Sequence, residues 1–334
     1  MRALILESVN HLVLRDVPKP VPAADELLIR VKAATICTSD IIDILEDPFH
    51  VPMNRVMGHE AAGVVEAVGA DVTDFRPGDE VAAHPIIPCR TCNTCRNGFG
   101  HLCDNMSHLG YQKPGVFAEY FTTRHDRVRR KPPHLSFPQA ALLEPVSVCI
   151  EAIKQAQVEP GQTVLVLGDG PFGVMTCRLC AAIPGVRVIL AGHYDSRMAG
   201  APGAIPINVK TTQDVTGTIR GLTNGIGVDA AILCVGSQTA TDTAIASLRT
   251  RGTFSIFAAV HGTPTIDLTR IHLKELTIRG SCSDMGCMDE AMAALGNGLM
   301  NGISTHEFPL EQYEKALDTA INGKASAFKV ALIP

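Results

Sequence analysis

The chain has 334 residues, which at about 150 residues per domain predicts roughly two domains. Lys and Arg together number 29 and Asp and Glu 34, so the net charge is −5, and this near-neutral balance argues against a nucleic-acid partner. With 46% hydrophobic and 19% charged residues, the composition is that of a globular protein with a large core. No apolar run reaches the length of about 20 residues that a membrane span needs, so we expect no membrane partner.

The first part of the chain predicts β structure. Strands are expected at 12–16, 26–37, 61–69 and 79–84, each bounded by Gly, Pro or Asp. Turn signals at this spacing indicate a compact antiparallel or barrel-like domain. Residues 84–110, which are rich in Cys, Gly, Asn, His and Pro, interrupt the pattern with a loop that needs its own source of order.

Four cysteines inside that loop stand as C-x2-C-x2-C-x7-C. Thiolates this close in sequence can surround one zinc ion tetrahedrally, and a site of four thiolates is closed and therefore structural. Four unrelated thiols, an iron–sulfur cluster and a nucleic-acid-binding zinc ribbon are the alternatives, although the loop holds few basic residues for a ribbon. The candidate ligands are Cys89, Cys92, Cys95 and Cys103.

From about residue 142 the pattern changes to strands that alternate with helices. A helix is expected over 146–157, a strand buried on both faces over 163–168, and a second strand over 186–191. Further segments continue this alternation, and it predicts right-handed βαβ units and a parallel doubly wound sheet. Two helix-like pieces and a final strand at 328–333 follow. The fold class is therefore α/β, with a mostly-β domain in front.

A glycine-rich turn follows the first of these buried strands. Gly168, Gly170 and Gly173 form G-x-G-x-x-G and are followed by a helix-like segment, which is the context that a dinucleotide-binding turn requires. Pro171 and Phe172 lie between them. The glycines allow close approach of a pyrophosphate, and the helix N-terminus offers free N–H groups to it. A purely structural turn is the alternative.

The residues after the second strand bear on the choice between NAD and NADP. An NAD site usually has Asp or Glu at this place, where the carboxylate accepts a hydrogen bond from the ribose. Here the place is near Gly192, and His193, Tyr194 and Arg197 follow. The missing acid and the nearby cationic side chains favour NADP over NAD, although Asp195 is close.

Three segments carry residues of the type that binds catalytic zinc. Cys37 lies in ICTSD, His59 and Glu60 lie in GHE, and Glu144 lies in LLEPVS. Cysteine, histidine and carboxylate form the ligand set of a zinc ion that keeps an open position for substrate. Each of them alone is more often a core or hydrogen-bonded residue than a ligand.

Together these motifs resemble the zinc-dependent medium-chain alcohol dehydrogenases over nearly the whole chain. The sequence LLEP is similar to the branch that contains polyol, sugar and threonine dehydrogenases. The motifs that carry the resemblance, in chain order, are ICTSD, GHEAAGVVEAVG, the four-cysteine loop, LLEPVSV, the glycine-rich turn and GVDAAILCVG.

The resemblance implies a domain plan. A GroES-like catalytic domain is expected over 1–148, with the structural-zinc lobe at 85–105, and a Rossmann domain over 149–283. The segment 284–334 is expected to rejoin the catalytic domain. Relatives assemble as dimers or tetramers, so a homodimer or homotetramer is expected.

The resemblance also implies a chemistry and the residues that perform it. Cys37 and His59 would bind catalytic zinc, and Glu60 or Glu144 would complete the shell, directly or through water. The reaction would transfer hydride between a secondary alcohol, such as a polyol, sugar or amino-alcohol derivative, and NAD(P). Two further residues match family positions. Ser39 resembles the hydroxyl that takes the substrate proton, and Asp40 resembles the carboxylate that orients the histidine ligand.

Two of the departures from the family bear on the proton relay and the substrate. Many relatives have a proton-relay histidine five residues after the first ligand, where this chain has Ile42. Sorbitol dehydrogenases have an Arg-Tyr pair near the end of the cofactor domain, whereas Arg279 and Gly280 are here followed by Ser281. Sorbitol is therefore a doubtful substrate. Two other functions stay open: a zinc-free quinone or enone reductase that uses NADPH, and a non-catalytic NADPH-binding protein.

The remaining cysteines bear on the compartment. The chain has 11 cysteines, and its N-terminus lacks the layout of a secretion signal. We therefore expect a cytoplasmic protein without disulfides. The cysteines without a proposed metal lie mostly in apolar runs and are interpreted as core thiols: Cys149, Cys177, Cys180, Cys234, Cys282 and Cys287.

Overall fold

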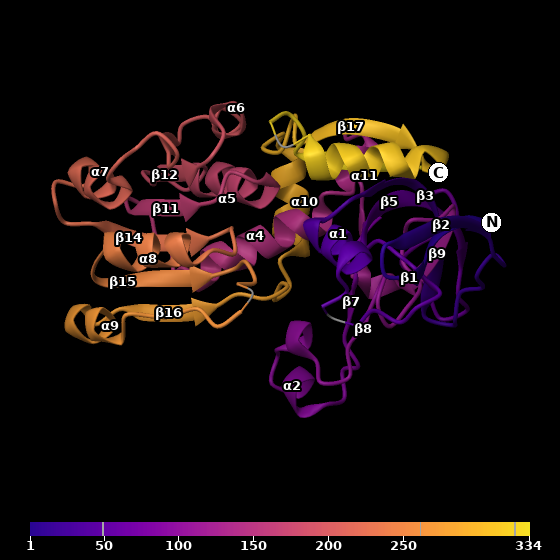
Figure 1. Cartoon of the computed structure of the whole chain (residues 1–334). Coiled ribbons are helices and arrows are strands. Elements are labelled where there is room, and N and C mark those ends of the chain that lie inside the picture. The colour runs from indigo at the N-terminus through magenta and orange to yellow at the C-terminus, as the bar shows by residue number, and fades with distance from the viewer. Residues whose placement is uncertain (49, 261, 324) are drawn as a thin grey trace. The chain divides into compact units, whose positions relative to one another are not determined.

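The computed structural model describes residues 1–48, 50–260, 262–323 and 325–334, which form two compact units. One unit combines Met1–Ser147 with Met285–Pro334, and the other spans Val148–Asp284 (Figure 1).

The first unit is built around a seven-stranded sheet. Its strand order is β10-β6-β5-β3-β18-β17, and β9 also pairs with β3. β3 is a long strand with most of its residues buried, and it pairs with β5 in an antiparallel register that sets Thr35 opposite Glu60. A second sheet has the order β2-β1-β4, and β7 pairs with β8. The strands are β1 (Arg2–Ser8), β2 (His11–Asp16), β3 (Glu26–Thr35), β4 (Arg55–Val56), β5 (Glu60–Val68), β6 (Glu80–Ala83), β7 (Ile86–Ile87), β8 (Ser107–His108), β9 (Tyr120–Arg124), β10 (Val128–Arg130), β17 (Ser304–Pro309) and β18 (Lys329–Ile333).

The C-terminal strand of the chain lies in this same sheet. β18 pairs antiparallel with β3, so that Ala331 faces Thr35, and parallel with β17. Apolar side chains from both ends of the sequence share one core, including Ile29, Phe117 and Val330. The helices of the unit are α1 (Thr38–Leu45), α2 (Asn93–Arg96), η1 (Gly100–Leu102), η2 (His125–Arg127), α3 (Phe137–Ala140), α10 (Met288–Gly296), η3 (Leu310–Gln312) and α11 (Tyr313–Asn322), and α4 (Leu143–Gln155) runs from this unit into the second.

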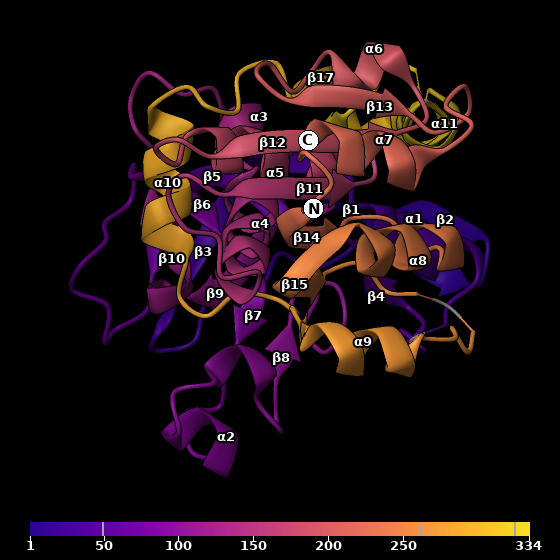
Figure 2. The ribbon, with the colours of Figure 1, turned by 90° about the vertical axis from the view of Figure 1, so that its left-hand side faces the viewer.

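The second unit is built on a six-stranded parallel sheet with the order β13-β12-β11-β14-β15-β16. Figure 2 labels β13 to β15, and Figure 1 labels β16 beside β15. β11 and β12 are runs of apolar residues that are buried on both faces, as a central parallel strand requires. α5 contacts β11 and β12, and α8 contacts β14 and β15. The elements are β11 (Thr163–Leu167), α5 (Pro171–Ala181), β12 (Arg187–Gly192), α6 (Asp195–Met198), β13 (Ile205–Asn208), α7 (Val215–Leu222), β14 (Val228–Leu233), α8 (Gln238–Ser247), β15 (Leu248–Ile256), α9 (Leu268–Lys274) and β16 (Thr277–Gly280).

The strand order confirms the predicted doubly wound sheet. The first two strands in sequence, β11 and β12, are neighbours, and the chain then crosses back so that β14 lies on the other side of β11. In such sheets ligands bind at the carboxyl ends of the strands beside this crossover. The glycine-rich turn lies at the carboxyl end of β11.

Candidate catalytic and cofactor sites

The end of β3 and the start of β5 bring three potential zinc ligands together. Because the β3–β5 ladder sets Thr35 opposite Glu60, the residues just beyond that pair, Cys37 and His59, come close. One potential ligand atom from each of Cys37, His59 and Glu60 lies within 4.8 Å of the other two. All three side chains are buried.

Asp40 holds two of these residues in place. Cys37 is the residue before α1, and its backbone N–H donates to Asp40 Oδ2 at 2.9 Å. His59 Nδ1 donates to Asp40 Oδ1, also at 2.9 Å. Burial opposes the charged form of His59, but the Asp40 carboxylate outweighs it and raises the pKa of the imidazole well above its ordinary value. With Nδ1 bound to Asp40, Nε2 is the ring nitrogen left for a metal, as in many histidine–carboxylate pairs beside zinc.

Glu60 has a buried partner that the sequence did not indicate. Lys329, the first residue of β18, donates from Nζ to Glu60 Oε1, and the hydroxyl of Thr35 donates to Glu60 Oε2. The side chains of Lys329 and Glu60 are 2% and 0% exposed. Burial lowers the pKa of Lys329, but the nearby carboxylates raise it more, so the ammonium stays charged. A lysine inside the apolar run FKVALI was the only sequence signal for this pair.

The other two residues expected at this site lie on helices of the same unit. Ser39 is half-buried in the first turn of α1, two residues after Cys37. Glu144 is half-buried in the first turn of α4, and its charge contributes to the raised pKa of Lys329. Glu144 is not part of the group formed by Cys37, His59 and Glu60 among the described residues.

Polar aromatic residues next to the ligand group were missed by the sequence reasoning. The ring centroid of His108 lies 5.5 Å from that of His59 and 4.8 Å from that of Tyr111. The Tyr111 hydroxyl donates to the Asp43 carboxylate, which is fully buried in α1. Burial raises the pKa of Asp43 to about 6 and lowers the pKa of His108 to about 3. Burial also raises the pKa of Tyr111, so both rings are neutral, and His108 is the one that lies beside His59.

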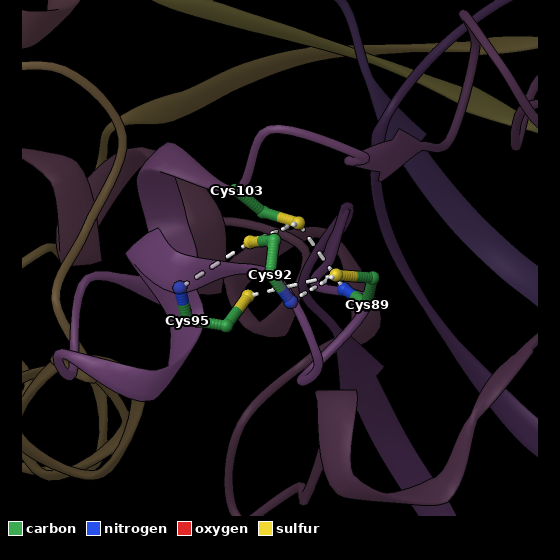
Figure 3. A group of neighbouring side chains, drawn as sticks. All are labelled: Cys89, Cys92, Cys95 and Cys103. Carbon is green, nitrogen blue, oxygen red and sulfur yellow. Dashed lines mark hydrogen bonds between the residues drawn. The ribbon is translucent and has the colours of Figure 1, made fainter.

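The four cysteines of the loop converge on one point (Figure 3). The Sγ atoms of Cys92 and Cys103 are 3.8 Å apart, and those of Cys89 and Cys95 are 4.0 Å apart. Four sulfurs at 2.3 Å from a central zinc ion would lie about 3.8 Å from one another, so the spacing fits one zinc ion. In an iron–sulfur cluster the four thiolates are divided among two or four iron atoms, so they do not all lie this close to one point.

Backbone N–H groups also point at these sulfurs. The N–H of Cys92 donates to Cys89 Sγ at 3.3 Å, that of Cys95 to Cys92 Sγ at 3.4 Å, and that of Cys89 to Cys103 Sγ at 3.3 Å. At Cys89, hydrogen bonds from the Thr91 hydroxyl and N–H and from the Cys92 N–H lower the pKa of the thiol to about 5. Donors of this kind stabilise thiolates, which are the form that binds zinc.

The glycine-rich turn in the second unit has the geometry expected of a dinucleotide site. Gly168 follows β11 with a φ of +111°, and Gly170 is the residue before α5, with Pro171 at the first helical position. A Cβ atom at Gly173 would lie 1.8 Å from the carbonyl oxygen of Gly168, so only glycine fits there. The Phe172 ring packs edge-on against Phe257, with centroids 5.3 Å apart.

Cationic side chains surround an aromatic ring after β12. Gly192 ends the strand, His193 is exposed, and Tyr194 is half-buried. Lys210 Nζ lies 4.3 Å from the centroid of the Tyr194 ring, and the guanidinium carbon of Arg197 lies 5.8 Å from it. All the residues that the sequence reasoning assigned to cofactor binding therefore lie at the carboxyl ends of β11 and β12.

Comparisons with known proteins agree with this arrangement. Residues 23–133 match the family described as alcohol dehydrogenase GroES-like domain, and residues 171–296 match zinc-binding dehydrogenase. Sorbitol dehydrogenase of Bacillus subtilis is 30% identical to the chain over 100% of this chain and 97% of its own length. L-threonine 3-dehydrogenase of the same organism is 31% identical over 96% of this chain and 95% of its own length. The chain belongs to the zinc-dependent medium-chain alcohol dehydrogenase family.

A solved structure supports the fold of this dehydrogenase. A proposed zinc-binding dehydrogenase from Sinorhizobium meliloti 1021, bound to NADP, superimposes with a TM-score of 0.93 and 26% identity, covering 100% of this chain and 99% of that one. The fold class predicted from the sequence, a GroES-like domain with a Rossmann sheet, is confirmed. The chain is thus a zinc-dependent oxidoreductase that transfers hydride between an alcohol and a nicotinamide cofactor.

Two further observations concern the rest of the dehydrogenase. In the part of the chain that the structure describes, no helix combines the length and the apolar character needed to cross a membrane. Its cysteines are all free thiols, and Cys282 is exposed, which corrects its interpretation as a core residue. Cys234 is half-buried, while Cys149, Cys177, Cys180 and Cys287 are buried as expected.

Proposed function

We propose that the dehydrogenase oxidises a secondary alcohol on a polyol, sugar or amino-alcohol derivative, at a zinc ion held by Cys37 and His59. Glu60 is the third candidate ligand, and Glu144 is the alternative for that position. The convergence of cysteine, histidine and carboxylate within 4.8 Å is the observation that carries the proposal, because this donor set suits catalytic zinc. The names of the sorbitol and threonine dehydrogenases that resemble the chain support the substrate class.

Each residue of the site then has a defined part in the reaction. When bound, the zinc ion supplies a Lewis acid that lowers the pKa of the substrate hydroxyl. Ser39 takes the substrate proton, and Asp40 holds His59 and the backbone of Cys37 in position. Ile42 stands where many relatives have the relay histidine, so this side chain cannot pass the proton on, and a bound cofactor and water would have to supply the acceptor.

We also propose that a second, structural zinc ion binds Cys89, Cys92, Cys95 and Cys103. The sulfur spacing and the N–H donors described above support this assignment. The site has no open position, so it orders the loop and takes no part in turnover.

For the cofactor we propose NADP in preference to NAD. The turn formed by Gly168, Gly170 and Gly173, with Pro171 and Phe172, would hold the pyrophosphate at the N-terminus of α5. Gly192, His193, Tyr194 and Arg197 would surround the adenosine ribose, and the cations beside Tyr194 would attract a 2′-phosphate.

The domain plan and the cellular setting are further parts of the proposal. The unit that holds the cysteine–histidine group is the catalytic domain, and the unit with the parallel sheet is the dinucleotide-binding domain. Free thiols throughout the described chain suit a reducing compartment, so we assign the enzyme to the cytoplasm. We expect a homodimer or homotetramer.

A substrate screen tests the function. Polyols, sugars and amino alcohols are each offered with NAD and with NADP, and reduced nicotinamide is followed by its absorbance. Reduction that depends on the alcohol and disappears in Cys37→Ala supports the proposal. Turnover that Cys37→Ala leaves unchanged would contradict it.

A further inference from the structure

A buried carboxylate lies between the glycine-rich turn and the end of β12. Asp169 stands between Gly168 and Gly170, and only 6% of its surface is exposed. Its Oδ2 accepts hydrogen bonds from the backbone N–H groups of His193 at 2.8 Å and Tyr194 at 2.6 Å. These are the first two residues after β12, so the Asp169 carboxylate lies at the carboxyl end of that strand.

Asp169 also explains why β12 ends in glycine. A Cβ atom built on Gly192 would lie 2.5 Å from the Asp169 Cβ and 2.8 Å from its Cγ. Real Cβ atoms do not approach other atoms this closely, and an acidic side chain at 192 would add a second charge beside the first. A carboxylate at 192 and one at 169 therefore exclude each other. The acid that the sequence lacks at the end of the second strand is supplied from the turn.

The neighbourhood of Asp169 carries charges of both signs. Lys210 and Arg197 flank the ring of Tyr194, the residue whose backbone N–H donates to Asp169. Burial lowers the pKa of Arg197, while the negative charge of Asp169 acts in the opposite direction. A 2′-phosphate placed here would be attracted by the cations and repelled by the carboxylate.

We propose that Asp169 is a specificity-determining residue for the adenosine ribose and limits the preference for NADP that Arg197 and Lys210 create. Asp169 Oδ1 makes no hydrogen bond to any described residue and is available to accept one from a ribose hydroxyl of NAD. The same charge disfavours the 2′-phosphate of NADP. The inference rests on the proposed binding of a nicotinamide dinucleotide at this turn.

Fluorescence titration of the zinc-loaded full chain with NADH and with NADPH tests the inference. The variant Asp169→Asn removes the charge but keeps an oxygen that can accept from His193 and Tyr194. The matched control is Asp195→Asn, which removes the same charge from an exposed carboxylate that accepts from Asn208 Nδ2 at 2.9 Å. The quantity compared is the Kd for NADH divided by the Kd for NADPH.

The ratio should rise at least about tenfold in Asp169→Asn and by less than about threefold in Asp195→Asn, because solvent screens the buried charge of Asp169 less than the exposed charge of Asp195. An unchanged ratio in Asp169→Asn, an equal rise in both variants, or an equal loss of both cofactors would overturn the inference. The wild-type ratio tests the proposed NADP preference separately. Failure of the wild type to bind either cofactor would overturn both.

An exchange variant gives a second, independent readout. Asp169→Gly combined with Gly192→Asp moves the carboxylate to the end of β12 without the steric conflict. The Kd for NADH divided by the Kd for NADPH should be lower in this variant than in Asp169→Asn, because a carboxylate is again present near the ribose. A ratio equal to that of Asp169→Asn would contradict the proposed role of the charge.

Discussion

Replacement of Lys329 by Met tests the buried ion pair beside the candidate zinc ligands. The change leaves the Glu60 carboxylate fully buried, with the Thr35 hydroxyl still donating to it but without its cation. Breaking a buried ion pair by removing one partner costs about 3–5 kcal/mol, since the remaining charge is uncompensated. We therefore expect Lys329→Met to lower the free energy of unfolding by about 3 kcal/mol or more.

Urea denaturation of the metal-free protein, followed by circular dichroism, measures this loss without competition from zinc at Glu60. Lys315→Met is the matched control, because Lys315 is exposed on α11 and its loss should cost less than about 0.5 kcal/mol. The double variant with Glu60→Gln should recover much of the loss, because no buried charge then remains. A Lys329→Met variant as stable as the Lys315→Met control would refute the reasoning.

Three other predictions concern the turn, the loop and the pH dependence of stability. Gly173→Ala should weaken NADPH binding by at least about tenfold, because its Cβ would lie 1.8 Å from a backbone oxygen, whereas Gly221→Ala, which meets open space, should leave the Kd unchanged. Cys92→Ser should reduce metal content by one zinc per chain and lower the unfolding midpoint, while the exposed Cys282→Ser should do neither; equal metal content in both variants would argue against the structural site. The folded-state pKa of Asp43, about 6, lies above its unfolded value of about 4, so its contribution to stability is present at low pH and is lost as the pH rises from about 4 to about 6. Asp43→Asn should therefore flatten the loss of stability across that interval in denaturation experiments, and an unchanged slope would count against the raised pKa.

Much of the fold follows from patterns that are local in the sequence. TVLVL and RVILAG are short apolar runs bounded by turn residues, and they form β11 and β12 as predicted. The glycine spacing predicts the strand–turn–helix geometry correctly. The structure gives the reason: the tight turn leaves no room for a Cβ atom at Gly173. In contrast, β17 has the mixed sequence STHEFP, and its pairing with β18 was not foreseen.

At the candidate sites, too, contacts between residues far apart in the sequence could not be predicted. Cys37 and His59 carry recognisable motifs, and the β3–β5 ladder brings them together. Lys329 lies 269 residues from Glu60, and no local pattern connects the two. Asp169 stands at a variable position of the glycine motif, so its contact with the residues after β12 became visible only in the folded chain. Pairings that depend on the folded topology were thus the part that the sequence could not provide.

Metal analysis of purified enzyme, combined with an alcohol-dependent assay of nicotinamide reduction, tests the central claim most directly. The two clusters of ligands predict two zinc ions per chain in the wild type. Cys37→Ala should retain one zinc per chain, held by the four-cysteine loop, and should lose turnover. A Cys37→Ala variant that keeps both zinc ions, or that turns over at the wild-type rate, would contradict the account.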